Sequence, residues 1–436
     1  MIRLICTLVA VLMPLKALAI EIQEVTSPGG ITAWLVEEDS IPFTALDIRF
    51  SGGANEEPLN QRGVTYLMMG LLEEGSADLD SQGFAEAAET LAARMSFDAN
   101  NDSVSVGISF LTENRDASIA LLRDALTDPT FDQAAVERVR DQVLAGLAAA
   151  ARDPQEIASK TFAGLSFPGH PYGMPLEGTP ETVSALTIAD LRAAHARALT
   201  RDQVQVGVTG DITAEELGPL LDTLLGGLPA TGDEPAPMVK TMLDGGVTVM
   251  DFPSPQSVVL FGQDGIAFED PDYFAAFVLN HILGGSGFAS RLMTEVREKR
   301  GLTYGIGTYL APRDLTNQIL GQFSSSNDKA AEAIEIVRTV WKEVSEGGVT
   351  QEQLDAAKTY LTGAYPLRFD GNSRIASILV GMQATGLPID YIIDRNDKID
   401  AVTLEDVRRV AARILKPEAL HFVVVGQPEG LTTGSF

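Results

Sequence analysis

Two side chains that donate hydrogen bonds, Arg297 and Tyr304, lie seven residues apart behind a glycine-rich segment that begins at Leu283. A guanidinium and a phenol can both donate to a peptide carbonyl oxygen, and to the oxyanion that forms when water attacks it. The spacing predicts that Arg297 lies near a helix end and Tyr304 on the following strand. The alternative is that Arg297 pairs with Glu295 or Glu298 on a solvated helix. The glycine-rich segment is not a phosphate-binding loop, because no preceding strand or lysine completes that motif.

Metal chemistry would need clustered ligands, and the four histidines of the chain do not cluster. No two of them have the i, i+3 or i+4 spacing that would place two zinc ligands on one helix face. The pattern places His281 in an apolar helix, His195 in the repeated helix, His421 in the repeated strand and His170 in a proline-bounded turn. We expect structural roles for all four.

The elements that must position these residues come in two copies. Residues 185–191 match residues 401–407 without a gap, at an offset of 216 (401 minus 185). In each copy a threonine at a helix N-cap, Thr187 or Thr403, is followed three residues later by an aspartate, a variant of the capping box. An amphipathic helix and an apolar strand follow in both. The repeat predicts two homologous lobes that each contain helices and strands.

The chain divides where proline, glycine and acidic residues accumulate after Leu228 and apolar periodicity stops. The pattern predicts long helices at 132–152 and 328–346, and strands at 43–50, 103–110, 247–250, 257–261 and 303–309. Because strands and helices are grouped, we expect an α+β fold in which each lobe is a mixed or antiparallel sheet with helices on one face. The predicted organisation is an N-terminal lobe at 20–227, a linker at 228–243 and a C-terminal lobe at 244–436.

An export signal is predicted at the N-terminus. A basic residue precedes an apolar run that ends at Leu15, and residues 17–19 form a small-x-small cleavage site, so residues 1–19 are typical of a signal peptide. The run is shorter than the roughly 20 apolar residues that span a bilayer, so no membrane insertion is expected. The only cysteine, Cys6, falls inside it, so core burial must stabilise the exported part. We expect a periplasmic protein, with release from the cell as the alternative.

The formal net charge of −28 at pH 7 excludes some classes of partner. Nucleic acids and anionic membrane surfaces would both repel so acidic a chain. So high a charge can also serve only to keep an exported protein soluble. The sequence supports this role at least as well as a role in steering a substrate to the protein.

The repeat, the segment 167–172 and the segment 301–304 together resemble the pitrilysin/insulinase family of zinc peptidases, in the subgroup with two lobes per chain. The resemblance implies a half-clamshell fold and an inverted zinc motif, His-x-x-Glu-His, in which the two histidines bind zinc and the glutamate between them acts as general base. A glutamate on a later helix is the third ligand. The frame of that motif is retained at 62–76, but the residues that match His, Glu and His are Tyr66, Met69 and Gly70. The third ligand position holds Ala145 or Gly146. None supplies an imidazole, thiolate or carboxylate, so we expect no zinc in this chain.

In active members of the family, an arginine and a tyrosine that match Arg297 and Tyr304 reach across to the zinc site of the opposite lobe and hold the substrate backbone. The resemblance therefore implies an inactive, substrate-binding subunit of a heterodimeric metallopeptidase. A homologous partner with an intact motif would supply the zinc, and an unfolded peptide would be the substrate. A second hypothesis is a non-proteolytic scaffold of the same fold, and a third is an active peptidase. The retained pair argues against the second, and the missing ligands argue against the third.

Overall fold

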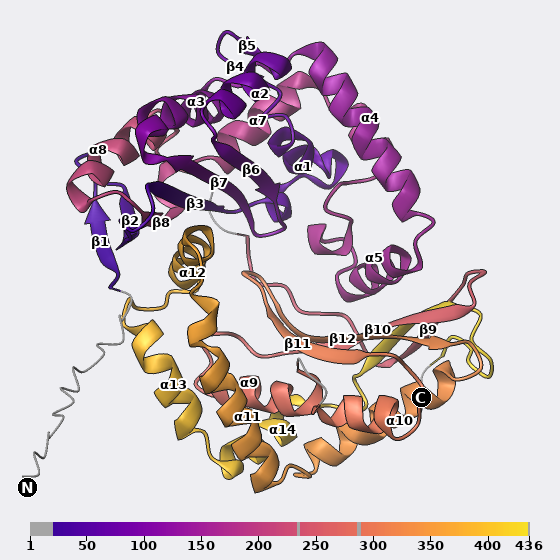
Figure 1. The fold of residues 1–436 in the computed structure, drawn as a ribbon. Helices are drawn as coiled ribbons and strands as arrows, with labels where there is room; N and C mark the ends of the chain where they lie inside the picture. The colour runs from indigo at the N-terminus through magenta and orange to yellow at the C-terminus, as the bar shows by residue number, and fades with distance from the viewer. Residues whose placement is uncertain (1–20, 233–235, 286–288, 435–436) are drawn as a thin grey trace, which may run out of the picture.

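The computed structural model describes residues 21–232, 236–285 and 289–434. The predicted signal peptide lies outside the described residues, as do residues 233–235 of the linker and 286–288 of the glycine-rich segment. Figure 1 shows two halves that face each other, each built around a sheet. Over the described ranges, no helix has both the length and the apolar character needed to cross a bilayer.

The first half is built on a six-stranded sheet. Its strands, in spatial order, are β1 (Gln23–Thr26), β2 (Thr32–Glu37), β8 (Val204–Gly210), β3 (Phe43–Ser51), β7 (Ser103–Leu111) and β6 (Arg94–Ala99). β2 and β8 run parallel, and all other neighbours run antiparallel. Side chains alternate between the two faces. Leu46, Ile48 and Phe50 of β3 are buried in the core on one face, whereas Asp47 and Arg49 point to the other.

The second half repeats this arrangement with five strands. Their spatial order is β11 (Ile306–Pro312), β12 (Asn317–Ser326), β10 (Gln256–Asp264), β13 (His421–Gly426) and β9 (Gly246–Asp251). β13 runs parallel to β9 and antiparallel to β10, as β8 does with β2 and β3. The helices that precede these two strands, α7 (Ile188–Ala198) and α14 (Leu404–Ile414), keep the offset of 216 and both begin with the predicted capping box. The structure therefore confirms the internal duplication.

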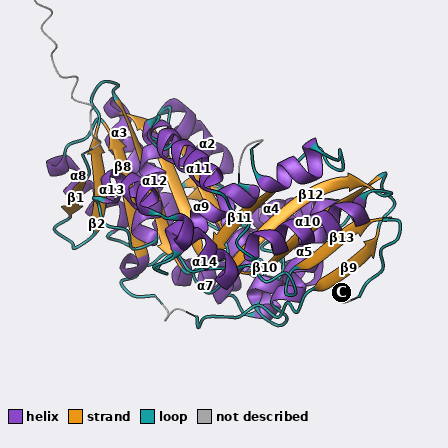
Figure 2. Ribbon diagram, turned by 90° about the horizontal axis from the view of Figure 1, so that it is seen from below, coloured by secondary structure: helices purple, strands orange, loops and turns teal. Residues whose placement is uncertain are grey.

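Helices cover both sheets, and Figure 2 shows the strands of the two halves as separate groups, each accompanied by helices. The remaining helices of the first half are α1 (Val64–Met69), α2 (Ser81–Thr90), α3 (Arg115–Thr127), α4 (Gln133–Ala150), α5 (Pro154–Ser166), α6 (Pro180–Ala185) and α8 (Ala214–Leu225). Those of the second half are α9 (Tyr273–Gly284), α10 (Ala330–Ser345), α11 (Gln351–Ala364), α12 (Asn372–Ala384) and α13 (Tyr391–Ala401). A two-stranded hairpin, β4 (Gly75–Ser76) and β5 (Leu79–Asp80), follows α1. The long helices predicted at 132–152 and 328–346 correspond to α4 and α10.

The two halves exchange one helix each, which the sequence did not indicate. α12 lies on β3 and β8 of the first sheet (Figure 1), where Ile375 and Leu379 pack against Trp34. α5 lies on β10 and β13 of the second sheet, where Phe162 packs against Leu260. Helices therefore cover both faces of each sheet, the second face by a contribution from the other half. The exchange buries apolar surface between the halves and makes them interdependent.

Gly207 of β8 makes the approach of α12 possible. A Cβ atom at this position would overlap the carbonyl oxygen of Ala376 in α12. We expect Gly207→Ala to destabilise the fold by about 1–3 kcal/mol, because either the helix or the strand must move. Gly381→Ala on the same helix is the control: a Cβ there meets open space, and we expect a gain of about 0.5–1 kcal/mol. Urea unfolding of the two variants measures both, and equal small effects would contradict the close packing of α12.

Candidate functional site

A buried ion pair fixes the start of α1, the helix that carries the degenerate zinc motif. The Arg62 guanidinium lies 3.1 Å from the Glu57 carboxylate, and both side chains are fully buried. The carboxylate also accepts hydrogen bonds from the backbone N–H groups of Gly63 (3.0 Å) and Thr65 (2.6 Å). These N–H groups at the helix start have no partner within the helix, and a carboxylate satisfies them. The frame of the motif thus has a structural role that does not depend on a metal.

Arg62 also ties α1 to two neighbouring segments. Its guanidinium donates to Asn101 Oδ1 (2.7 Å), in the turn between β6 and β7, and to the carbonyl oxygen of Pro175 (2.9 Å). The loop after Pro175 then packs on Gly63, where a Cβ would overlap the carbonyl oxygen of Glu177. Gly63 accordingly has a φ of 96°, a value that favours glycine. α1, the β6–β7 turn and the Glu177 loop are therefore held together as one unit.

The degenerate motif positions differ in their surroundings. Met69 is 1% exposed and belongs to the core, whereas Tyr66 is 37% exposed. Gly70 ends α1 beside α4, where a Cβ would lie 3.6 Å from Val139 Cγ1. Gly146, seven residues or about two turns further along α4, is exposed and has open space where a side chain would point. Two of the four positions are thus glycines, of which Gly146 faces open space and Gly70 packs beside Val139.

These positions do not fit zinc. A protein zinc site uses imidazole, thiolate or carboxylate ligands. A phenol, a thioether and two glycines provide none of these groups. Within the described part of the chain, His, Cys, Asp and Glu side chains nowhere gather in threes that could hold a metal ion.

Arg297 and Tyr304 lie in the second half, whereas the degenerate motif lies in the first. Arg297 is in the last turn of a short π-helical segment, Met293–Glu298. Such segments are rare and often occur at functional sites. Glu295, one of the two alternative partners proposed for Arg297, binds Lys299 (2.6 Å) and Arg300 (2.8 Å).

The prediction that Tyr304 lies on a strand is wrong, because β11 begins at Ile306. The intervening backbone is held by side chains: Thr303 Oγ1 donates to the carbonyl oxygen of Ser324 (2.7 Å), and Ser325 Oγ donates to that of Leu302 (2.6 Å). Tyr304 follows these anchors and is 87% exposed. The structure thus displays a tyrosine side chain on a fixed segment with almost no cover from its own chain.

The edge strand β6 was not predicted and adds a candidate binding surface. Within the described residues, β6 pairs with β7 on one side only. A groove of about 560 Å³ runs beside it, lined by residues of β3, β6 and β7 that include Asp47, Arg94, Asp98 and Gly107, and bounded by α12 through Ser377. An edge strand presents unpaired N–H and C=O groups to an extended peptide. The alternating polar and apolar residues of 94–99 are the sequence signal that could have revealed this strand.

The equivalent edge strand in the second half, β11, is partly covered by α9. Asn280 of α9 donates from Nδ2 to the carbonyl oxygen of Thr308 (3.2 Å) in β11, and the Thr308 hydroxyl donates to Asn280 Oδ1 (2.9 Å). Gly284 lies so close to Thr308 that its missing Cβ would overlap the threonine side chain. Of the two duplicated edges, β6 is therefore the more accessible one.

The histidines have the structural roles that were expected. Their partners are the backbone N–H of Tyr172 for His170, the carbonyl oxygen of Leu126 for His195, the ring of Tyr360 for His281, and the Thr248 hydroxyl and Gly245 carbonyl for His421. Burial lowers the pKa of His195 and His281, so neither carries a charge near neutral pH.

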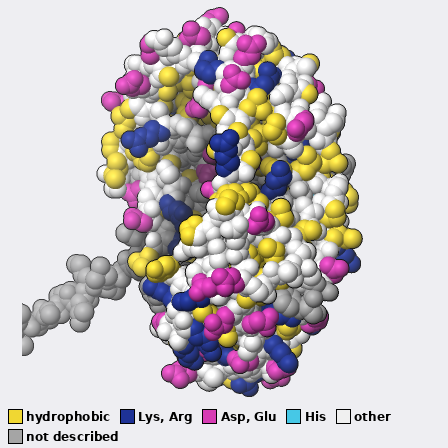
Figure 3. Space-filling view, turned by 90° about the vertical axis from the view of Figure 1, so that its right-hand side faces the viewer, with side chains coloured by type: hydrophobic (Ala, Val, Ile, Leu, Met, Phe, Trp, Pro, Cys, Tyr) yellow, Lys and Arg dark blue, Asp and Glu magenta, His cyan; other side chains and the backbone are white. Residues whose placement is uncertain are grey.

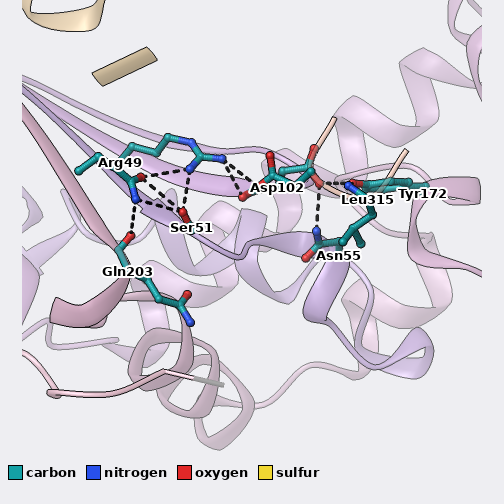
Figure 4. A network of polar contacts seen from close by, with 9 residues as sticks. Arg49, Ser51, Asn55, Asp102, Tyr172, Gln203 and Leu315 are labelled. Carbon is teal, nitrogen blue, oxygen red and sulfur yellow. Dashed lines mark hydrogen bonds and ion pairs between the residues drawn. The ribbon is translucent and has the colours of Figure 1, made fainter. Parts of the chain in front are cut away.

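A polar network that the sequence could not reveal joins the two halves (Figure 4). The Arg49 guanidinium of β3 lies 3.1 Å from the Asp314 carboxylate in the β11–β12 turn. The Tyr172 hydroxyl donates to Asp102 Oδ1 and accepts from the backbone N–H of Leu315 (3.3 Å). Burial and the nearby Asp102 charge raise the pKa of Tyr172, which keeps its proton. The network fixes the ends of the β6–β7 and β11–β12 hairpins against each other.

Charged side chains on the outer surface are mixed in sign. Figure 3 shows Lys and Arg interspersed with Asp and Glu on the side that it views. Arg409 and Arg413, for example, both pair with Asp272. On that side, the negative net charge therefore does not form one continuous acidic surface.

The fold and the degenerate motif define a class of protein: a duplicated α+β half-clamshell with the frame of a zinc peptidase. Residues 34–180 match the family described as insulinase (peptidase family M16), and residues 185–361 match the peptidase M16 inactive domain. The chain belongs to this family, as the resemblance predicted.

Individual relatives extend the match over nearly the whole chain. The non-peptidase homolog YmxG of Helicobacter pylori is 27% identical over 97% of this chain and 98% of its own. The mitochondrial-processing peptidase subunit beta of Blastocladiella emersonii is 22% identical over 93% of this chain and 88% of its own. A crystal structure described as a peptidase M16 inactive domain from Pseudomonas fluorescens superposes with a TM-score of 0.87 at 28% identity, covering 95% of this chain and all of the other.

Proposed function

We propose that this chain is the non-catalytic, substrate-binding subunit of a heterodimeric zinc metallopeptidase in the periplasm. A homologous subunit with an intact His-x-x-Glu-His motif supplies the zinc, and Arg297 and Tyr304 reach into that subunit's site. The substrate is an unfolded peptide, and this chain holds no cofactor of its own.

The observation that carries the proposal is the exposure of Tyr304. A large aromatic side chain that is 87% exposed has few contacts to hold it, yet the flanking backbone is anchored to β12. Such an arrangement suits a group that completes its contacts on another molecule. Together with the absence of a zinc ligand at Tyr66, Gly70 and Gly146 and of the general base at Met69, it favours a residue that acts in trans. The non-peptidase relative of H. pylori also supports a non-catalytic role.

The open edge of β6 supports the substrate-binding part of the proposal. An unfolded peptide can add to this edge as a further strand, because its backbone supplies the missing hydrogen bonds whatever its sequence. The rigid unit of α1, the β6–β7 turn and the Glu177 loop holds that edge in place before the peptide binds, which reduces the entropic cost of binding.

Assembly tests this proposal directly. The exported chain and a homologue with the intact motif are purified separately, mixed, and measured by native mass spectrometry. We expect a one-to-one complex with one zinc ion, which is also present on the homologue alone and absent from this chain alone. A chain that stays unassociated in the mixture would contradict the heterodimer and favour a scaffold role with other partners.

A further inference from the structure

We propose that Met293 and Thr303 are positioning residues, which hold the Tyr304 side chain at a fixed place relative to Arg297. This inference rests on the proposed function, in which Arg297 and Tyr304 act together at the zinc site of a partner. Met293 and Thr303 would not touch the substrate themselves. Peptide hydrolysis depends on such positioning, because a displacement of about 1 Å in a reacting or binding group can cost about 100-fold in rate.

The backbone that leads from Arg297 to Tyr304 bonds back to the π-helical segment. Gly301, with a φ of 61°, ends that segment in the left-handed conformation, and its N–H donates to the carbonyl oxygen of Arg297 (2.8 Å). The N–H of the next residue, Leu302, donates to the carbonyl oxygen of Val296 (3.0 Å). The residues just before Tyr304 are therefore connected directly to the segment that carries Arg297.

Met293 makes a second connection, on the other side of Tyr304. The N–H of Ile306, the first residue of β11, donates to Met293 Sδ (3.4 Å), and both residues are buried. Among the described strands, β11 lies at the edge of its sheet, so an N–H on its outer side needs an acceptor from elsewhere. A thioether is a weak acceptor, but the unbranched methionine side chain can adapt its shape to reach the N–H. Met293 thus joins the start of β11 to the start of the π-helical segment.

Thr303 fixes the backbone on both sides of Tyr304. Its hydroxyl donates to the carbonyl oxygen of Ser324 in β12 (2.7 Å) and accepts from the N–H of Gly305 (3.2 Å). Thr303 is 8% exposed, whereas Tyr304 is 87% exposed. Together with the two connections to the π-helical segment, these bonds leave the backbone of Tyr304 little freedom. Its exposed side chain can then move mainly by rotation about its own bonds.

Substitutions can remove each connection with little change in volume. Met293→Leu removes the sulfur acceptor and is a substitution that protein cores usually tolerate. Thr303→Val keeps the branched shape of the side chain and removes only its hydroxyl. Each change leaves a backbone N–H or carbonyl group without its partner, which is unfavourable. We therefore expect the backbone to shift towards other partners and to displace Tyr304.

The test measures hydrogen exchange and turnover in the same variants. In the full exported chain alone, Met293→Leu should speed amide exchange at Ile306 by about tenfold, as measured by mass spectrometry of peptides that span it. In the reconstituted pair, Met293→Leu and Thr303→Val should each lower kcat by about three- to tenfold and leave KM within about twofold. Met382→Leu, the same substitution at a buried site beside Trp34, should change neither quantity.

A double-mutant cycle separates positioning from a general structural effect. If Met293 acts through the Tyr304 hydroxyl, Met293→Leu should change kcat by less than about twofold once Tyr304→Phe has removed that hydroxyl. A general effect on the site would lower kcat by the same factor in both backgrounds. The same cycle with Thr303→Val tests the second residue independently, and it serves alone if Met293→Leu does not fold.

The possible failures are distinguishable. Unchanged exchange at Ile306 in Met293→Leu would overturn the connection through sulfur, whatever the partner does. Faster exchange with unchanged kcat, or equal losses of kcat with and without the Tyr304 hydroxyl, would overturn the positioning role and leave the proposed function standing. A wild-type pair without turnover would overturn the proposed function and the positioning role together.

Discussion

Arg297→Ala is expected to lower the kcat/KM of the reconstituted peptidase pair by about 100- to 1,000-fold while the pair still assembles. In the proposed composite site, the guanidinium donates hydrogen bonds to the substrate carbonyl as negative charge develops on its oxygen. Loss of one such preorganised donor typically costs this much in rate. Tyr304→Phe, which removes only the hydroxyl from an exposed ring, should reduce the rate without weakening assembly.

The neighbouring Arg300 provides a matched control. It lies three residues after Arg297, just beyond the π-helical segment, and pairs with Glu295, which Lys299 also binds. Arg300→Ala should therefore leave kcat/KM within about twofold of wild type, because exposed pairs of this kind contribute little. Unchanged turnover in the Arg297 variant, with complex formation verified by size-exclusion chromatography, would remove Arg297 from the site.

The second large effect is on stability and concerns the ion pair beneath the degenerate motif. Glu57→Ala should lower the free energy of unfolding by about 3–5 kcal/mol. The substitution leaves the Arg62 charge buried without compensation, and it also leaves the N–H groups of Gly63 and Thr65 without their acceptor. Urea denaturation followed by circular dichroism measures the loss.

An exposed ion pair provides the control for the Glu57 substitution. Glu343 pairs with Arg291 at 2.8 Å, but its side chain is 54% exposed. Glu343→Ala should cost less than about 1 kcal/mol. If the two substitutions cost the same, α1 does not depend on the buried pair, and the structural explanation for the retained frame fails.

The sequence predicted the locally encoded parts of the fold. Capping boxes at Thr187 and Thr403 require only residues three positions apart, and both are present. The internal repeat predicted two similar sheets because each copy carries its own helix and strand. Patterns of this kind depend on neighbours in the chain, which a single sequence displays.

Non-local packing could not be predicted in the same way. Nothing in residues 372–384 indicates that α12 packs on the sheet of the other half, since an apolar helix face is equally compatible with either sheet. The Arg49–Asp314 pair joins residues 265 positions apart. Tyr304 follows apolar and β-branched residues that favour a strand, but the side-chain hydrogen bonds of Thr303 and Ser325 hold the backbone outside β11 until Ile306.

The candidate site was predicted in part. The absence of ligands at Tyr66, Met69, Gly70 and Gly146 could be read from the sequence, because a missing functional group needs no structure to be recognised. The contacts that hold the motif in place could not, because Arg62 binds Asn101 and Pro175, which are distant from it in sequence.

The central claim is that one active site is divided between two chains. Its most direct test measures cleavage of a quenched, unstructured peptide by this chain alone, by a homologue with the intact zinc motif alone, and by the two mixed with zinc present. We predict activity in the mixture well above the sum of the separate chains, and none from this chain alone. Equal activity of the homologue with and without this chain would contradict the divided site.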